Sequence, residues 1–371
     1  MSDEALSQDP LHPRRTTDLL GHAAAEANLL DAYRSGRLPH AWLISGPKGI
    51  GKATLAFRFA RFLLAEGGQA DEPAAGLFGP GDAPQANLDM APDNPVFRRV
   101  AAEGHADLLT VERSVNERTG KLRGEISVED VRKLPGFFSL TAAEGGYRVA
   151  IVDSADEMNR HAANALLKIL EEPPARAVLL IIANAPGGLL PTIRSRCRRL
   201  TLRPLDDATV AEVLRRRLPE TEPAELATLA KLAEGSPGRA ISLARLGGVA
   251  VYRDLIDLLK PLPELDFAAL HAFGDKLGRR ENQPAFQAMI DLLSWWLTRL
   301  VRFAAAASPP PEIAGGEGAL AQRLSQGRGL DRWLEVWEKV CRLVERADSI
   351  NLDRKQVVLN VFTALSRAAK G

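Results

Sequence analysis

One stretch of the sequence has the residue types and the spacing of a phosphate-binding loop. Four residues separate Gly46 from Gly51, and Lys52 follows directly. In such loops glycines let successive backbone N–H groups point inward, the next helix adds its positive end, and the lysine reaches the β- and γ-phosphates of a nucleotide. A Gly-rich turn that only connects a strand to a helix is the alternative. The residues that we predict to contact nucleotide here are Gly46, Pro47, Lys48, Gly49, Ile50, Gly51, Lys52, Ala53 and Thr54.

The side chains that would hydrolyse the nucleotide are missing at two positions. A Ser or Thr normally follows the lysine and holds Mg²⁺, but this chain has Ala53, and Thr54 is rotated by about 100° around the helix. Asp153 ends an apolar run, either as the carboxylate beside Mg²⁺ or only as a helix cap. The next residue is Ser154, where a hydrolytic enzyme of this type has a Glu that polarises water. We therefore predict weak or absent Mg²⁺ binding and absent or very weak ATP turnover by this chain.

Three more polar residues are candidates for contacts with a nucleotide. Asn184 follows an apolar strand and can sense a γ-phosphate or water, although an Asn there can also serve only as a turn former. Arg196 lies in a Ser-Arg-Cys triplet among other arginines, which suits insertion into a phosphate site on a neighbouring subunit; a solvated basic turn is the alternative. Arg239 begins a helix after a tight turn and either reaches nucleotide or stays on the surface.

Strands alternate with helices in the part of the chain that carries most of these residues. Helices are predicted at about 23–34, after the phosphate loop, from Ser127, and from about Asp156 to Leu170. The alternation predicts an α/β domain with a doubly wound parallel sheet over residues 1–203. Residues 66–105 lack periodicity, and we expect an insertion or long loop there rather than core. Apolar runs predict the strands at about 41–44, 107–112, 147–153, 177–182 and 200–202.

The pattern beyond Pro204 is helical throughout. Helices near 206–217, 223–234 and 237–246 predict a small helical lid over residues 204–247. Four to six longer helices follow and predict an all-α C-terminal domain over residues 248–371. The four tryptophans at helical spacings in that domain are expected in its core rather than in a stacking platform: Trp295, Trp296, Trp333 and Trp337.

The bulk properties point to a cytoplasmic protein. The net charge of +1 gives no general attraction to nucleic acid or membrane, and no apolar run approaches the roughly 20 residues of a membrane span. The first residues are polar and do not resemble a signal peptide. The two cysteines, Cys197 and Cys341, fit a reducing compartment and suggest neither a disulfide framework nor a metal site.

Three motifs together resemble the AAA+ clamp-loader ATPases of bacterial DNA polymerase III, whose members include the γ/τ and δ′ subunits. The motifs are the phosphate loop at 46–52, the Leu-Leu-Lys-x-Leu-Glu-Glu-Pro-Pro block at 166–174, and Ser-Arg-Cys at 195–197. The resemblance covers roughly residues 18–246 by motif, and the last two motifs are the specific ones. It implies an AAA+ fold with a helical lid and a C-terminal collar domain that holds a ring together.

The pairs Lys52-Ala53 and Asp153-Ser154 are similar to those of the δ′ type, whose own site does not hydrolyse nucleotide. By this resemblance, Arg196 completes the ATPase site of a neighbouring subunit. The resemblance also implies a heteropentamer with γ/τ and δ subunits, a sliding clamp and primer-template DNA as partners, and a place in a nucleotidyltransferase holoenzyme. Members commonly carry a four-cysteine zinc module after the phosphate-loop helix. Residues 66–105 contain no cysteine, so we expect no zinc and a reshaped or disordered insertion.

Two other functions remain as alternatives. A self-sufficient AAA+ ATPase, either a γ/τ-like motor or a junction helicase, would hydrolyse ATP itself, and Ala53 and Ser154 speak against it. A P-loop kinase or another small-molecule enzyme fits the helical second half and the Ser-Arg-Cys triplet poorly. Whether ATP or ADP binds at Lys52 is left open by the sequence.

Overall fold

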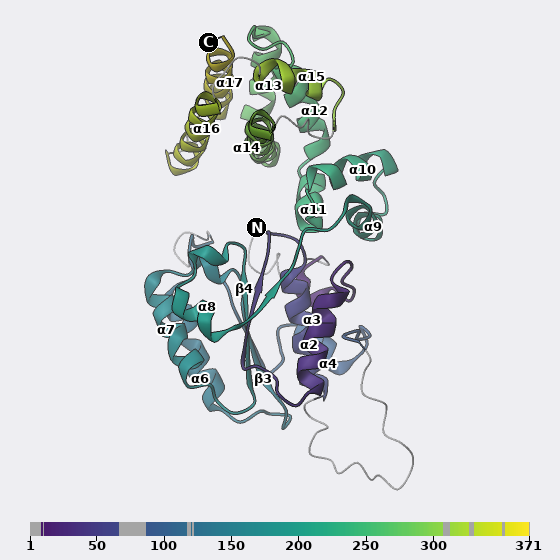
Figure 1. The fold of residues 1–371 in the computed structure, drawn as a ribbon, viewed down its shortest axis with the longest axis vertical. Coiled ribbons are helices and arrows are strands. Elements are labelled where there is room, and N and C mark those ends of the chain that lie inside the picture. Colours follow the sequence, from purple (N-terminus) through teal and green to yellow (C-terminus); the bar gives the residue numbers. More distant parts are fainter. Residues whose placement is uncertain are drawn as a thin grey trace. The chain divides into compact units, whose positions relative to one another are not determined.

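The computed structural model describes residues 9, 11–66, 87–116, 120, 122–306, 312–325, 330–350 and 353–370. It divides into two compact units, the first formed by 1–213 with 234–238 and the second by 214–233 with 239–371 (Figure 1). The predicted division into three domains at 1–203, 204–247 and 248–371 stays a prediction.

The first unit is built on a parallel five-stranded sheet, which confirms the predicted fold class. Its strands run in the order β2-β3-β4-β1-β5, so β1 lies between β4 and β5. Trp42 of β1 pairs with Leu180 of β4 on one side and with Arg198 of β5 on the other. The strands are β1 (Ala41–Ser45), β2 (Leu108–Val111), β3 (Arg148–Val152), β4 (Ala177–Ala183) and β5 (Arg198–Thr201).

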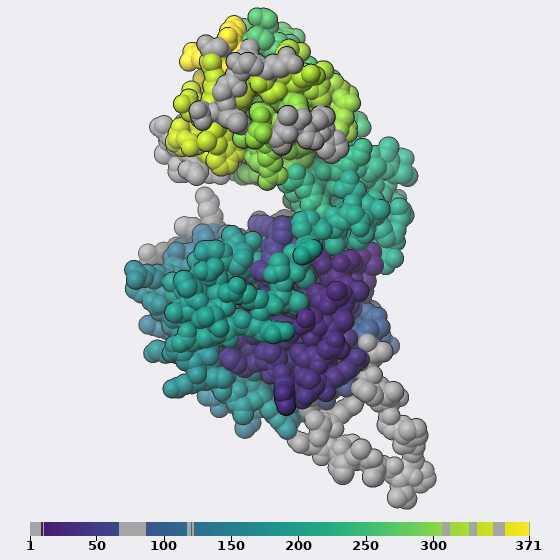
Figure 2. Space-filling view, viewed as in Figure 1, coloured from purple at the N-terminus to yellow at the C-terminus, as the bar shows by residue number. Residues whose placement is uncertain are grey.

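Helices cover both faces of this sheet (Figure 1). Side chains alternate along each strand, so Trp42 and Ile44 pack with α2 (Ala23–Arg34), α3 (Lys52–Glu66) and α4 (Pro95–Ala101). Ala41 and Leu43 face the other layer. In the space-filling view, the purple amino-terminal residues and the teal residues near 200 form one continuous surface of this unit (Figure 2). The opposite layer consists of α5 (Val128–Val131), α6 (Lys133–Ser139), α7 (Arg160–Glu171) and α8 (Pro191–Arg196).

The expectation of a long loop over the whole of 66–105 is wrong for residues 87–105. Asn94 accepts a hydrogen bond from the backbone N–H of Val96, and Pro95 provides a favourable first turn, so α4 forms. Phe97 and Val100 are buried in the core of the first unit. A helix of seven residues is too short to establish a recognisable period in the sequence. Residues 67–86 lie outside the described part of the chain.

The helix predicted from about Asp156 begins later. Asn159 accepts a hydrogen bond from the backbone N–H of Ala162 at 2.9 Å and thereby caps α7, which starts at Arg160. The preceding residues form a 3-10 turn, η2 (Ala155–Glu157). Asp156 instead accepts hydrogen bonds from the backbone N–H groups of Asn184 and Ala185, both at 2.9 Å, and so braces the loop after β4.

The second unit is helical, as predicted. In the described residues, six helices follow residue 247, and Trp295, Trp296 and Trp333 are buried among them, as expected for core residues. No helix of the described chain is long and apolar enough to cross a membrane. The helices from residue 207 onward are α9 (Asp207–Arg217), α10 (Pro223–Leu232), α11 (Pro237–Arg245), α12 (Gly248–Leu259), α13 (Phe267–Gly278), α14 (Gln283–Ala306), α15 (Glu317–Ser325), α16 (Leu330–Ile350) and α17 (Arg354–Lys370). Of the remaining 3-10 turns, η1 (Pro13–Arg15) and η3 (Pro186–Gly188) belong to the first unit and η4 (Arg280–Asn282) belongs to the second.

Candidate functional site: a phosphate loop and a remote arginine

The phosphate loop connects β1 to α3 and needs glycine at its two ends. Gly46 has a φ of +148°, and a Cβ there would lie 2.5 Å from the carbonyl oxygen of Leu202. Gly51 has a φ of +107°, and its Cβ would lie 2.8 Å from Leu19. Side chains at these positions would be strained by the backbone and would also clash. The spacing of the glycines is therefore required by the turn itself, with or without a ligand.

Lys52 is almost fully buried at the first position of α3, with 4% of its surface exposed. Its ammonium group has three N–H donors. They go to the carbonyl oxygens of Gly46 and Pro47, at 2.8 and 2.6 Å, and to Oδ1 of Asn184 at 2.8 Å. All three donors are thus used within the chain, and a phosphate that binds Lys52 has to replace at least one of these acceptors.

The residues around Lys52 lie at the carboxyl edge of the sheet, where ligand sites of parallel α/β sheets form. β1, β3 and β4 end immediately before Gly46, Asp153 and Asn184, so the structure brings three predicted site residues together. Burial lowers the pKa of Lys52 to about 8, and the negative charges of Asp153 and Asp156 oppose that shift. Burial also raises the pKa of Asp153, which Lys52 partly offsets.

The two positions that depart from a hydrolytic site are occupied by side chains with other contacts. Ala53 packs against the core beneath α3 and offers no hydroxyl. Ser154 has a left-handed backbone, with φ +59°. Its Oγ accepts a hydrogen bond from Nδ2 of Asn184 at 3.3 Å and donates one to Asp153 at 3.4 Å. These residues do not fit a Mg²⁺ site that needs a hydroxyl ligand after the lysine.

Two segments distant in sequence hold the outside of the loop. Nε2–H of the buried His22 donates to the carbonyl oxygen of Ile50 at 2.7 Å, and burial lowers the pKa of His22, which favours the neutral ring. Ser236 Oγ donates to the carbonyl oxygen of Lys48 at 2.8 Å. The N–H of Gly238 donates to the carbonyl oxygen of Gly49, also at 2.8 Å. Sequence reasoning missed these contacts, because neither a lone His nor a Ser-Pro-Gly turn reveals its distant partner.

Arg196 lies at the opposite edge of the sheet from the phosphate loop. It precedes β5 by two residues, and Arg198 at the start of β5 pairs with Trp42 near the start of β1. Gly46 comes after the end of β1. At about 3.3 Å per residue, the four residues from Trp42 to Gly46 put the start of β5 roughly 13 Å from Gly46 along the strand direction, and Arg196 comes before that start. Arg196 therefore does not belong to the phosphate site of its own chain.

Arg196 itself lies at the surface, where its side chain is 37% exposed. Nη2 forms an ion pair with Oε1 of Glu171 at 2.9 Å, and Nη1 donates to the carbonyl oxygen of Thr192 at 3.3 Å. The Ser-Arg-Cys triplet and the Leu-Glu-Glu-Pro-Pro block therefore touch through a pair of charged side chains. The sequence contained both motifs but no sign of this contact.

Arg239 belongs to the second unit, where its guanidinium lies 5.5 Å from the centre of the Trp295 ring. Its predicted contact with nucleotide stays a prediction. Thr54, the residue after Ala53, is half-buried in α3. Its predicted contact with nucleotide also stays a prediction.

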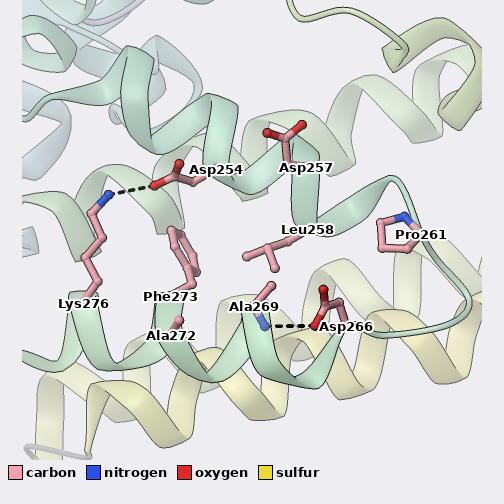
Figure 3. Close-up of a pocket in the computed structure, with 9 residues that line it drawn as sticks. All are labelled: Asp254, Asp257, Leu258, Pro261, Asp266, Ala269, Ala272, Phe273 and Lys276. Atoms are coloured by element: carbon pink, nitrogen blue, oxygen red, sulfur yellow. Dashed lines mark hydrogen bonds and ion pairs between the residues drawn. The ribbon is translucent and has the colours of Figure 1, made fainter.

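The second unit also contains a groove of about 570 Å³ between α12 and α13 (Figure 3). Leu258 and Phe273 contribute apolar side chains to it, and none of the predicted site residues lines it. Its three carboxylates are already engaged: Asp254 with Lys276, Asp257 with Lys260, and Asp266 with the backbone N–H of Ala269. All three carboxylates that line this groove therefore have partners within the second unit.

The sheet order, the phosphate loop after β1 and the helical second unit define a P-loop protein of the AAA+ class. Residues 80–206 match the family described as "DNA polymerase III, delta subunit". DNA polymerase III subunit delta' of Pseudomonas aeruginosa is 36% identical over 266 residues, which cover 71% of this chain and 72% of that protein. The chain belongs to the family of DNA polymerase III delta' subunits.

Two relatives from Escherichia coli show that the chain is similar to more than one kind of DNA polymerase III subunit. DNA polymerase III subunit delta' of that organism is 33% identical over 215 residues, which are 58% of this chain and 57% of that protein. DNA polymerase III subunit tau is 31% identical over 235 residues, which are 62% of this chain but only 32% of tau. The chain is thus a delta' relative that is also related to gamma/tau subunits, as the three sequence motifs predicted.

Proposed function

We propose that this chain is a subunit of a clamp loader that does not hydrolyse ATP at its own site and supplies Arg196 to the ATPase site of a neighbouring subunit. Its partners would be γ/τ and δ subunits in a heteropentamer. That assembly would open a sliding clamp and place it on primed DNA, as part of the polymerase holoenzyme.

The position of Arg196 carries this proposal. The guanidinium is exposed at the amino edge of the sheet, whereas Lys52, Asp153 and Asn184 gather at the carboxyl edge. An arginine so placed is available to a second subunit and not to its own phosphate loop. Arginine binds phosphate oxygens through several N–H groups and stabilises the charge that develops during phosphoryl transfer.

The geometry around the phosphate loop supports the other half of the proposal. Ala53 provides no Mg²⁺ ligand, Ser154 provides no base, and Lys52 has used its three donors on acceptors of its own chain. ATP or ADP that binds here has to compete with these internal hydrogen bonds. Binding of ATP or ADP without hydrolysis is compatible with this role.

The proposal is tested by steady-state ATP turnover of the purified chain, alone and assembled with an active γ/τ-type subunit and δ. We expect no turnover by the isolated chain, and turnover by the assembly that depends on Arg196. Mg²⁺-dependent turnover by the isolated chain that disappears in Lys52→Ala would contradict the proposal and identify a self-sufficient ATPase.

A further inference from the structure

Glu171 is the residue through which the structure fixes the direction of the Arg196 side chain. It is the last residue of α7, and Arg196 is the last residue of α8. Both helices are labelled in Figure 1. The two helices pack together through buried residues that include Leu170 and Ile193. With the helices fixed in this way, the Oε1 atom of Glu171 lies 2.9 Å from Nη2 of Arg196.

The location of Glu171 is electrostatically unfavourable for its own helix. A carboxylate at the C-terminus of a helix faces the negative end of the helix dipole. Both side chains of the pair are substantially exposed, 37% for Arg196 and 50% for Glu171, and an ion pair with such exposure contributes little to stability. The contact is therefore poorly explained by stabilisation of the fold, whereas it restricts the orientation of a long, flexible side chain.

The contact leaves most of the guanidinium free to bind another group. An arginine has five N–H donors. In this chain Arg196 directs Nη2 to Glu171 and Nη1 to the carbonyl oxygen of Thr192. These two contacts use one N–H on each of the two terminal nitrogens and leave the remaining N–H groups for phosphate oxygens. An oriented guanidinium has already lost the rotational freedom that binding would otherwise cost.

We infer that Glu171 is a positioning residue that holds the Arg196 guanidinium in the orientation in which it enters a phosphate site on a neighbouring subunit. This inference rests on the proposed function of Arg196. Glu171 itself touches no phosphate and acts only through Arg196.

The test is the ATP turnover of an assembled complex in which the site beside this chain is the only active ATPase site, with the Glu171 and Arg196 variants made in this chain. Glu171→Ala should lower kcat roughly 2- to 5-fold by releasing the side chain of Arg196, since an exposed ion pair is worth at most about fivefold in a rate, with KM for ATP unchanged. Glu171→Gln keeps an acceptor oxygen and should recover most of the loss. Glu172→Ala is the matched control, since Glu172 is the adjacent exposed carboxylate after α7 and should leave kcat unchanged.

A double-mutant cycle separates positioning from any other effect. In an Arg196→Ala background, Glu171→Ala should cause no further loss of kcat, because the group that it positions is absent. The inference is overturned if Glu171→Ala leaves kcat at the wild-type value, or if it lowers kcat equally in both backgrounds. If Arg196→Ala alone has no effect on kcat, the proposed function fails first and the inference fails with it.

Discussion

Replacing Lys52 by Met tests how far burial lowers the pKa of this ammonium group in the phosphate loop. The pKa of Lys52 falls from its ordinary value of 10.5 to about 8 because the side chain is buried. Below pH 8 both the folded and the unfolded chain hold this proton. Between pH 8 and 10.5 only the unfolded chain holds it, so raising the pH favours the folded state.

This argument gives a magnitude. Each unit of pKa difference corresponds to about 1.4 kcal/mol, so the free energy of unfolding of the wild type should gain up to about 3 kcal/mol relative to Lys52→Met between pH 7.5 and 10.5. The loss of the hydrogen bonds of Lys52 and of its attraction to Asp153 sets the difference between the two proteins at pH 7.5. The prediction therefore concerns how the difference between the two proteins changes with pH.

The assay is urea unfolding at 25 °C at several pH values from 7.5 to 10.5. If the two units unfold in separate transitions, the transition of the first unit is the one to compare. Lys48→Met, which removes an exposed lysine of the same loop, controls for the loss of one charge. A difference between wild type and Lys52→Met that stays constant over this range would refute the reasoning, because the ammonium group would then titrate alike in both states.

Three further predictions concern the first unit. Asp107→Ala should lower the free energy of unfolding by about 3–5 kcal/mol in urea unfolding. The substitution removes the buried acceptor of the N–H groups of Ala143 and Glu144 and leaves Arg148 without its nearby charge. A loss under about 1 kcal/mol would contradict this prediction. Gly238→Ala should lower the free energy of unfolding by about 1–3 kcal/mol in the same assay, because the new Cβ would lie 2.8 Å from Cα of Gly49. Gly187→Ala is the control and should be nearly neutral, because open space surrounds Gly187. Equal effects of the two substitutions would argue against the contact between Gly238 and Gly49. Ser154→Glu should not create ATP turnover in the isolated chain, because Ala53 still lacks a hydroxyl, and measurable Mg²⁺-dependent turnover would show that the base alone was missing.

Most of the regular elements of the first unit could be predicted because a local sequence pattern specifies them. The apolar runs are long enough for buried parallel strands, and the helix at Ala23–Arg34 was predicted with its observed limits. The helix at Pro95–Ala101 was missed because its apolar residues span only two turns. The start of α7 was placed at about Asp156, whereas the residues at 155–157 form a 3-10 turn and Asn159 supplies the cap.

The candidate site was predictable in its residue types but not in its contacts. Gly46, Asp153 and Asn184 each follow a strand that the sequence predicted, and the structure places them at one edge of the sheet. The hydrogen bonds of Lys52 to its own loop and the pair between Glu171 and Arg196 depend on side-chain directions that no local pattern encodes. These contacts require the packed structure.

The measurement that most directly tests the account is the kcat for ATP with Arg196→Ala in this chain, in an assembled complex whose only active ATPase site is the one beside this chain. Arginines supplied to a phosphate site contribute roughly 10³-fold or more to kcat. Arg198→Ala, which removes an exposed arginine two residues away, is the control for the loss of positive charge. A fall in kcat of roughly 10³-fold at the site completed by this chain, with Arg198→Ala near wild type and assembly intact, is the predicted result. Equal activity of the Arg196→Ala and wild-type complexes would contradict the central claim.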